Sequence, residues 1–185
     1  MPLGLGYNER MSGAGEKILI LDRGVVELAY PREWTVKANP AGHLELKDPS
    51  DSATLEISYL KVPPLGPDAP KVEDLLRGVL PGTEGAGSAG SVATAERGTL
   101  RRAWATYPFE ADDTEKGLLR KAFGRWMIGG SGSVFVLMTY YYWADDAAWA
   151  VPAWEGMAES LRVEGAVAPA SRTPRWTERE RGSMN

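Results

Sequence analysis

The stretch VFVLMTYYYWADDAAW, residues 134–149, places three consecutive tyrosines and a tryptophan in a segment with strong β preference. Successive side chains of a strand point to opposite faces, so Tyr141 and Trp143 share one face while Tyr140 and Tyr142 share the other. This is more aromatic surface than an ordinary exposed strand carries. We therefore expect the two faces to have different roles, one in the core and one serving a partner in part.

The surrounding sequence predicts how this strand is paired. Residues 91–111, 118–128 and 133–143 read as three long strands of an antiparallel meander, with turns at DDTEKG and GGSG. Shorter strands are predicted upstream at 17–22, 25–30, 34–37, 43–47 and 53–61, the first two joined at Arg23-Gly24. The sequence therefore predicts an antiparallel β-sheet of about six to eight strands.

Two helices are expected to pack on this sheet. Residues 71–80 carry apolar positions at the three- and four-residue spacing of one stripe. A closing helix, capped by Asp145 or Asp146, carries Trp149 and Trp154, and Pro152 predicts a kink or a restart within it. This order of strands and helices gives an α+β fold.

Composition limits the classes of protein that fit. The chain has 185 residues, 43% of them hydrophobic, which suits one compact domain. Its net charge of −4 argues against nucleic-acid binding, because phosphate neutralisation needs a concentrated positive surface. Cysteine is absent, which removes disulfides, thiolate catalysis and cysteine-ligated metals.

The organisation of the chain is predicted from the same features. Residues 17–164 form a single domain, between a flexible N-terminus, residues 1–16, and a flexible C-terminal tail, residues 165–185. Glycine and serine around Met11 indicate that residues 1–10 are dispensable. No stretch reaches the ~20 apolar residues of a membrane span, and the start lacks the pattern of a secretory signal. We expect a cytoplasmic protein.

Counting from the predicted turns divides the meander into two faces. Large residues flank small ones on the face that we assign to the core: Ala103, Ala105, Tyr107, Phe109, Leu118, Ala122, Gly124, Trp126, Phe135, Leu137, Tyr141 and Trp143. Cations and aromatic rings mix on the other face, which suits cation–π contacts or a protein interface. Its candidate binding residues are Trp104, Lys121, Phe123, Arg125, Tyr140 and Tyr142. Alternatively, this face is a second core face that the other helix covers. We favour this alternative for most of the face and expect one part of it to stay uncovered.

The sequence contains no recognisable catalytic or metal-binding pattern. The single histidine, His43, lies on the polar side of a strand without a second base or ligand. Asp112, Asp113 and Glu115 crowd one turn, but the calcium-loop spacing is missing, so a solvated hairpin tip is favoured. We expect no catalytic residue, no metal and no cofactor, and therefore no enzyme.

Three short motifs resemble a known superfamily. AYPREW, with Tyr30, Pro31 and Trp34, is followed by LKDPSDSATLEIS and by a terminal ESLRV. This succession resembles the PsbP/Mog/DcrB-type α/β/α sandwich over about residues 17–164. The superfamily includes photosystem extrinsic subunits, a nuclear GTPase-binding factor, bacterial lipoproteins and adaptors that chaperone secreted toxins. The resemblance implies a protein-binding scaffold and transfers no catalytic residue.

Two functions stay open from the sequence. The first is a non-catalytic protein-interaction module of the adaptor or chaperone type, whose partner is another protein or a second copy in a homodimer. The second is a carrier of a small apolar or aromatic ligand held between sheet and helix. The lack of a lipid-bearing cysteine favours the cytoplasmic, adaptor-like branch of the superfamily.

Overall fold

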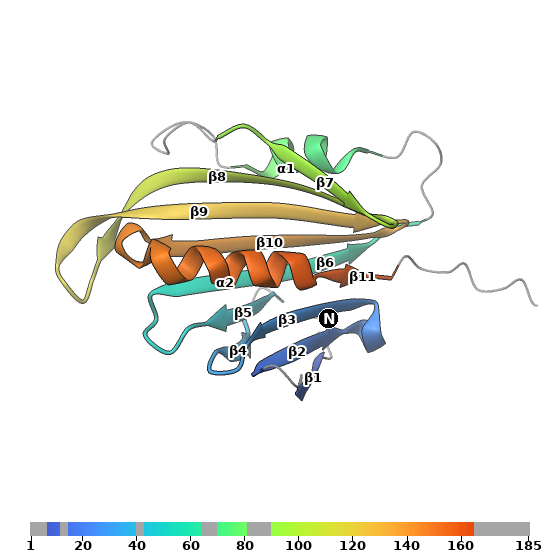
Figure 1. Ribbon diagram of the computed structural model, residues 1–185. Helices are drawn as coiled ribbons and strands as arrows, with labels where there is room; N and C mark the ends of the chain where they lie inside the picture. Colours follow the sequence, from blue (N-terminus) through green and yellow to red (C-terminus); the bar gives the residue numbers. More distant parts are fainter. Residues whose placement is uncertain (1–6, 12–14, 40–42, 64–69, 81–89, 165–185) are drawn as a thin grey trace, which may run out of the picture.

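The structure, a computed structural model, describes residues 7–11, 15–39, 43–63, 70–80 and 90–164. Within these residues the chain forms two antiparallel sheets and two α-helices (Figure 1). The smaller sheet has the order β1 (Tyr7–Met11), β2 (Glu16–Leu21), β3 (Val26–Pro31) and β11 (Arg162–Val163). The larger sheet has the order β4 (Thr35–Ala38), β5 (Leu44–Lys47), β6 (Ala53–Lys61), β10 (Val134–Trp143), β9 (Leu118–Ser131), β8 (Leu100–Asp113) and β7 (Ala93–Arg97).

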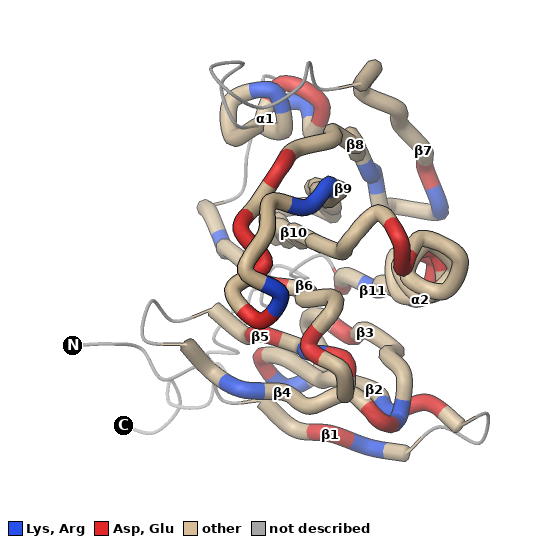
Figure 2. The backbone as a smooth tube through the Cα atoms, turned by 90° about the vertical axis from the view of Figure 1, so that its left-hand side faces the viewer, with Lys and Arg blue, Asp and Glu red and all other residues tan. Residues whose placement is uncertain are grey.

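The two helices cover opposite faces of the larger sheet, so the predicted α+β architecture with helices packed on an antiparallel sheet is confirmed (Figure 2). Helix α1 (Val72–Val79) packs Val72 and Leu76 against Ala103, Ala105 and Ile128. Helix α2 (Ala147–Ser160) belongs to the main core, which it shares with the smaller sheet. The core members from α2 are Ala150, Trp154, Met157 and Ala158.

The residues of the three sequence motifs hold this arrangement together. The ring of Trp34 stacks on Tyr140 with centroids 6.2 Å apart. Asp48 accepts hydrogen bonds from the backbone N–H of Ser50 (2.9 Å) and of Ala53 (2.6 Å), which fixes the turn between β5 and β6. Asp48 therefore acts as the side-chain cap of this turn.

Ser160, at the end of α2, completes the edge of the smaller sheet. Its hydroxyl lies 2.9 Å from the backbone N of Ala29, which donates to it, and 3.3 Å from the carbonyl O of Ala29. Two residues further on, Arg162 of β11 pairs with Glu27 of β3 in the ordinary ladder. The single hydroxyl hydrogen has a nearer acceptor in the carbonyl of Met157 at 2.8 Å, so Ser160 serves Ala29 chiefly by accepting from its N–H.

Two predicted elements differ from the structure. The first long strand, predicted at 91–111, is a hairpin of β7 and β8, which turns at Gly98 with a φ of +61°. Helix α2 continues through Pro152 without a restart. The N–H that proline lacks would have bonded the carbonyl of Ala148, an exposed residue whose carbonyl water can reach.

The N-terminal segment predicted to be flexible contains a strand. Residues 7–11 form β1, antiparallel to β2, and Tyr30 donates a hydrogen bond of 2.6 Å to Glu9. All residues of β1 except Tyr7 are exposed. The predicted C-terminal tail lies outside the described residues.

Pro108 lies on the outer edge of β8, where the described residues place no paired strand beyond Thr106. Strand β7 pairs only with residues 100–104 of β8, and the N–H of Gly90 donates to the carbonyl of Thr106. Because backbone direction alternates along a strand, Pro108 has its nitrogen on this same outer edge. Proline is tolerated there, since no ladder bond is lost, and it protects the edge against pairing with another strand.

Candidate protein-binding face

The meander places the predicted residue sets on two faces, although the predicted pairing was shifted. Tyr141 pairs with Gly124, and Gly124 pairs with Tyr107. Counting outward from the predicted turns instead pairs Tyr107 with Arg120 and Trp126 with Phe135, four positions away from the observed partners in each hairpin. Because four is even, each residue stays on its predicted face.

The face predicted to bind a partner lies largely in the main core. Tyr140 is fully buried and Tyr142 is 4% exposed. The ring of Tyr140 lies between Trp34 and Trp154, with a centroid distance of 5.6 Å to Trp154. The Tyr140 hydroxyl donates to the carbonyl of Ala150 in α2 at 3.2 Å. The expectation that Tyr140 and Tyr142 are accessible is therefore wrong, because α2 and the smaller sheet pack on this face.

The other four predicted binding residues are more accessible. Trp104, Phe123 and Arg125 are half-buried, and Lys121 is exposed. Phe123 stacks on Tyr142 at 5.6 Å, and the Arg125 guanidinium lies 5.9 Å from the centre of the Tyr142 ring. The predicted mixture of cations and rings is thus present, but it lies at the border of the core. A contact between these four residues and a partner stays a prediction.

The opposite face, which we had assigned to the core, also carries half-buried rings. We call the set Phe109, Trp126, Leu137, Tyr141 and Trp143 the open face. Among the described residues, α1 packs on Ala103, Ala105 and Ile128 at one end of it, and Trp126 and Leu137 contact this cluster. The core assignment holds for Ala103, Ala105, Tyr107 and Ala122, which are buried, and is wrong for Leu118, which is 49% exposed. The open face is only partly buried.

Hydrogen bonds and close packing fix the rings at the centre of the open face. The ring of Tyr107 lies directly over Gly124, where a β-carbon would meet its ring atoms. The indole N–H of Trp126 donates to the Tyr107 hydroxyl at 2.9 Å. Burial raises the pKa of Tyr141, and the neighbouring Tyr107 and the charge of Glu56 raise it further. These rings are therefore held as a preformed surface with a neutral phenol.

Two small pockets flank Tyr141 on the open face. One, of about 210 Å³, is lined by Asp51, Thr54, Phe109, Tyr141 and Trp143. The other, of about 150 Å³, is lined by His43, Glu56, Ser58, Trp126, Leu137 and Tyr141. Each pocket combines aromatic walls with a carboxylate, a composition that suits recognition of a side chain rather than of a large ligand.

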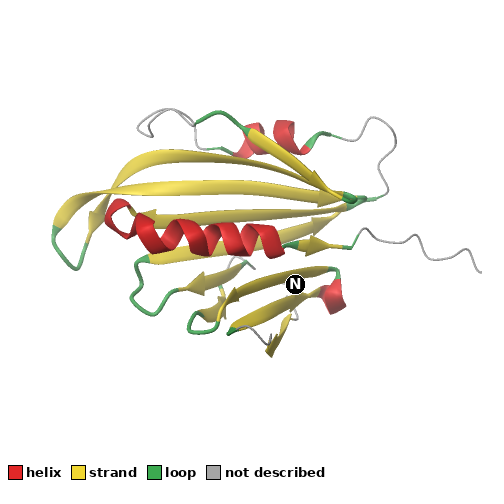
Figure 3. Ribbon diagram, in the orientation of Figure 1, coloured by secondary structure: helices red, strands yellow, loops and turns green. Residues whose placement is uncertain are grey.

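A hairpin arm extends the open face at one end. Strands β8 and β9 continue past the last residue of β10, since Ala111 pairs with Arg120 while Trp143 already pairs with Ala122 (Figure 3). Leu118 and Leu119 at the end of this arm are 49% and 58% exposed. The arm therefore presents apolar side chains to solvent.

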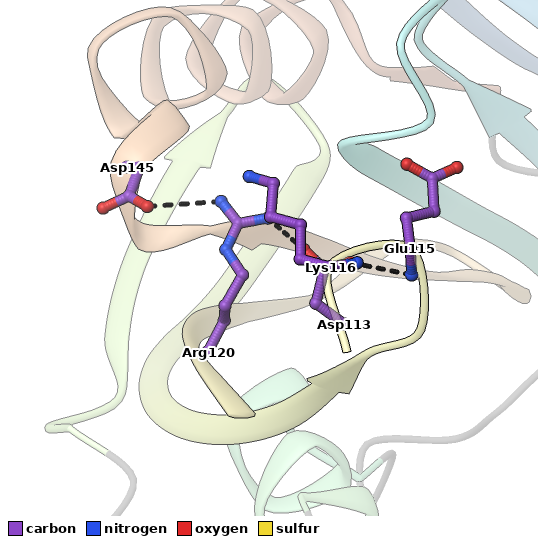
Figure 4. A network of polar contacts seen from close by, with 5 residues as sticks. All are labelled: Asp113, Glu115, Lys116, Arg120 and Asp145. Atoms are coloured by element: carbon purple, nitrogen blue, oxygen red, sulfur yellow. Dashed lines mark hydrogen bonds and ion pairs between the residues drawn. The ribbon is translucent and has the colours of Figure 1, made fainter. Parts of the chain in front are cut away.

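Arg120 fastens this arm to the body of the protein (Figure 4). Its guanidinium lies 2.7 Å from Asp113 and 3.2 Å from Asp145, and 4.5 Å from the centre of the Trp143 ring. Hydrogen bonds from the backbone N–H of Lys116 and from Arg120 lower the pKa of Asp113. Asp113 also accepts a hydrogen bond from the backbone N–H of Glu115, so its carboxylate stabilises the turn between β8 and β9. In the described part of the chain no three acidic, histidine or cysteine residues gather as a metal site would require.

Solved structures with a similar arrangement confirm the fold type. CyanoP, a cyanobacterial PsbP from Synechocystis, aligns over 89% of this chain and 100% of its own, with 12% identity and a TM-score of 0.56. Mog1p, a Ran-binding protein of Saccharomyces cerevisiae, aligns over 87% and 97%, with 10% identity and a TM-score of 0.51. A Bacteroides thetaiotaomicron protein aligns over 77% of this chain at 15% identity and a TM-score of 0.54, and this chain spans 46% of its length. The chain thus has the PsbP/Mog/DcrB-type fold.

Sequence comparison gives the family. The alr1449 protein of Nostoc sp. is 28% identical over 155 residues, covering 80% of this chain and 78% of its own. The Alr1449 family model matches residues 17–167, the region that contains both sheets' main strands and both helices. On this match, the chain belongs to the Alr1449 family.

Proposed function

We propose that this protein is a non-catalytic interaction module of the adaptor type, which docks a partner protein on the open face. The observation that carries the proposal is the set of five large apolar side chains half-exposed on one side of the larger sheet. A fully covered aromatic ring buries ~150–250 Å² at roughly 25 cal/mol per Å², and a partner adds only the part of this area that each half-buried ring still exposes. A partner that covers Trp126, Tyr141 and Trp143 would therefore gain favourable free energy.

The preformed state of this surface supports the proposal. Rings that are already fixed by hydrogen bonds and packing lose little conformational entropy on binding. Tryptophan and tyrosine are also the residues that most often dominate the binding energy of protein interfaces. The described polar groups at the centre bond one another, as Trp126 and Tyr107 do, and we propose no catalytic role for them.

The fold neighbours and the absence of a spanning helix are compatible with this role. Mog1p, named a Ran-binding protein, builds a protein-binding function on the same fold. No helix in the described ranges is long and apolar enough to cross a membrane. We propose a cytoplasmic location and a separate protein as the partner, and a second copy of this chain is the alternative that the test separates.

Photo-crosslinking from defined positions tests the proposal. A benzoyl-phenylalanine at Leu137 lies on the open face, whereas one at Glu155 lies on the exposed side of α2. In cells of the source organism, we expect a discrete crosslinked product from Leu137 that is lost with Tyr141→Ala. The mass of the product separates another protein from a homodimer. Identical products from both positions, or a Leu137 product insensitive to Tyr141→Ala, would count against the open face.

The alternative of a small apolar or aromatic ligand carried between sheet and helix does not match the hollows that the described residues form. The hollow of about 690 Å³ between the start of α1 and the larger sheet is lined by the charged residues Lys71, Glu73, Glu96, Arg101 and Arg102, which do not suit an apolar ligand. The space between α2 and the larger sheet contains the stacked rings of Trp34, Tyr140 and Trp154. Both flanking pockets lie instead on the opposite side of the sheet, where Tyr141 separates them. We therefore do not adopt this alternative.

A further inference from the structure

The 150 Å³ pocket beside Tyr141 carries an unbalanced carboxylate, that of Glu56. The side chains that share one row across five strands of the open side are Lys37, Glu45, Glu56, Thr139 and Trp126. Glu56 therefore stands directly opposite another glutamate on one side and next to the aromatic centre on the other. Like charges in such directly opposed positions repel each other and destabilise the pair.

Glu45 and Glu56 differ in whether a lysine or arginine lies close to their carboxylates. The Nζ of Lys47 lies 3.5 Å from a carboxylate oxygen of Glu45, and Lys37 occupies the position directly opposite Glu45. Within the described residues no lysine or arginine nitrogen lies within 4 Å of Glu56. Glu56 is nevertheless half-buried. A half-buried carboxylate without an internal cation gains most from a cation supplied from outside.

The walls of the pocket determine which cation fits. The indole of Trp126 and the phenol of Tyr141 line it together with the hydroxyl-bearing Ser58 and Thr139, and His43 also lines the pocket. Cations are attracted to the faces of such rings, and arginine is the more frequent partner because its planar guanidinium can stack. The same group can pair with a carboxylate through two parallel N–H···O bonds.

On the basis of the proposed function, we propose that this pocket receives an arginine side chain of the partner protein. The guanidinium stacks against Trp126 and Tyr141, its N–H groups donate to the Glu56 carboxylate, and the hydroxyls of Ser58 and Thr139 accept the remaining donors. The partner therefore presents an arginine at the centre of its contact surface. The net charge of −4 on this chain favours the approach of such a basic surface.

The structure itself contains a comparable arrangement one step along the sheet. The guanidinium of Arg120 lies 4.5 Å from the centre of the Trp143 ring and bonds Asp113 and Asp145. There, a ring and carboxylates hold an arginine that belongs to the chain. At the Glu56 pocket the ring and the carboxylate are present, and the cation is the element that the partner supplies.

Peptide titration followed by NMR tests the pocket without knowledge of the partner. The probes are acetyl-Gly-Arg-Gly-amide, its lysine analogue and its citrulline analogue, which keeps the shape of arginine and removes the charge. The indole N–H signal of Trp126 is the reporter. We expect the arginine peptide to shift this signal at millimolar concentration, the lysine peptide to bind more weakly, and the citrulline peptide to bind on the order of tenfold more weakly.

Two matched variants separate the pocket carboxylate from general surface charge. Glu56→Gln and Glu45→Gln remove the same charge from directly opposed positions of the same row. We expect Glu56→Gln to weaken the arginine peptide about tenfold, whereas Glu45→Gln changes its affinity less than about twofold. Because Glu56→Gln removes the repulsion from Glu45, its melting temperature stays equal to that of the wild type or rises.

Three results would overturn the inference: citrulline binding as tightly as arginine, lysine binding more tightly than arginine, or equal effects of the two glutamine variants. Its failure is distinguishable from failure of the proposed function. If crosslinking from Leu137 depends on Tyr141 while Glu56→Gln leaves the crosslinked yield and the peptide affinity unchanged, the open face is an interface without an arginine pocket.

Discussion

Replacing Gly124 by alanine tests whether the ring of Tyr107 determines the shape of the open face. A β-carbon on Gly124 would lie 2.6 Å from the Tyr107 hydroxyl and 2.7 Å from its Cε1, with the Cζ atom equally in the way. No real β-carbon approaches ring atoms so closely, and the ring is a rigid group that cannot bend aside. Tyr107, which is 5% exposed, must therefore turn out of its site.

The expected cost follows from what the displaced ring loses. Overpacking of a core site costs about 1–3 kcal/mol, and the broken hydrogen bond from Trp126 adds roughly 0.5–1.5 kcal/mol. A glycine-to-alanine change otherwise stabilises by about 0.4–1 kcal/mol, because it restricts the unfolded chain. Together these ranges give a net loss of about 0.5–4 kcal/mol, with a central value of about 2 kcal/mol. For a chain of 185 residues the central value lowers Tm by roughly 4–8 °C.

Calorimetry and urea unfolding measure this effect, with Gly156→Ala as the matched control. Gly156 lies exposed in α2, where an added β-carbon meets no atom within 4 Å, so alanine there stabilises by up to about 1 kcal/mol. In the double variant with Tyr107→Ala, the Gly124→Ala cost should largely disappear. An unchanged or raised Tm for Gly124→Ala alone would refute the close contact between ring and backbone.

Three further changes probe the anchors of the fold. Asp113→Asn removes a carboxyl whose pKa is lowered in the folded state; such a group stabilises above its unfolded pKa of about 3.9 and loses this effect as the pH falls. The variant should therefore be less stable at pH 7 and no less stable near pH 2, which urea unfolding at both pH values checks. Ser160→Ala leaves the N–H of Ala29 without its acceptor and should cost about 1–3 kcal/mol by thermal unfolding; a shift below a few tenths would contradict this role. A chain that starts at Met11 loses the Glu9–Tyr30 bond, most of the β1–β2 pairing and the contact of Tyr7 with the main core, while the side chains of the other β1 residues are exposed. Circular dichroism should therefore show a native fold with a lower Tm; an unfolded product would show that β1 is essential.

Local patterns in the sequence were sufficient for most single elements. Strand β6 has the predicted bounds, 53–61, because Ala53, Leu55 and Ile57 alternate with polar residues and are buried as expected. Helix α1 lies within the predicted 71–80 because its apolar stripe is unambiguous. Strand β1 was missed, since an exposed strand held by backbone pairing and one side-chain bond has no apolar pattern to detect.

Which face of the meander is buried depends on the packing of elements far apart in the sequence. The local sequence pattern therefore could not predict it. The cations among the rings led us to expect solvent on the side of Trp104 and Arg125. In the structure, the nearby Arg102 is 7% exposed and donates to the carbonyl of Ala158 at 2.8 Å. Helix C-termini leave carbonyl groups without intrahelical donors, and arginine supplies them. A cation within an aromatic face can therefore indicate the end of a covering helix as well as solvent.

Small residues on the open side have two different roles, which the sequence pattern alone does not distinguish. Alanine and glycine at the centre of the meander were assigned to the core, a pattern of small residues between large ones that suits a helix lying across a sheet. Helix α1 does use Ala103 and Ala105 in this way. Gly124 instead accommodates the flat ring of Tyr107, which in turn accepts the bond from Trp126. Because these rings are held by the backbone beneath them and by their own hydrogen bond, they do not require a covering helix to keep their positions. This explains how a partly exposed aromatic surface stays fixed in the free protein.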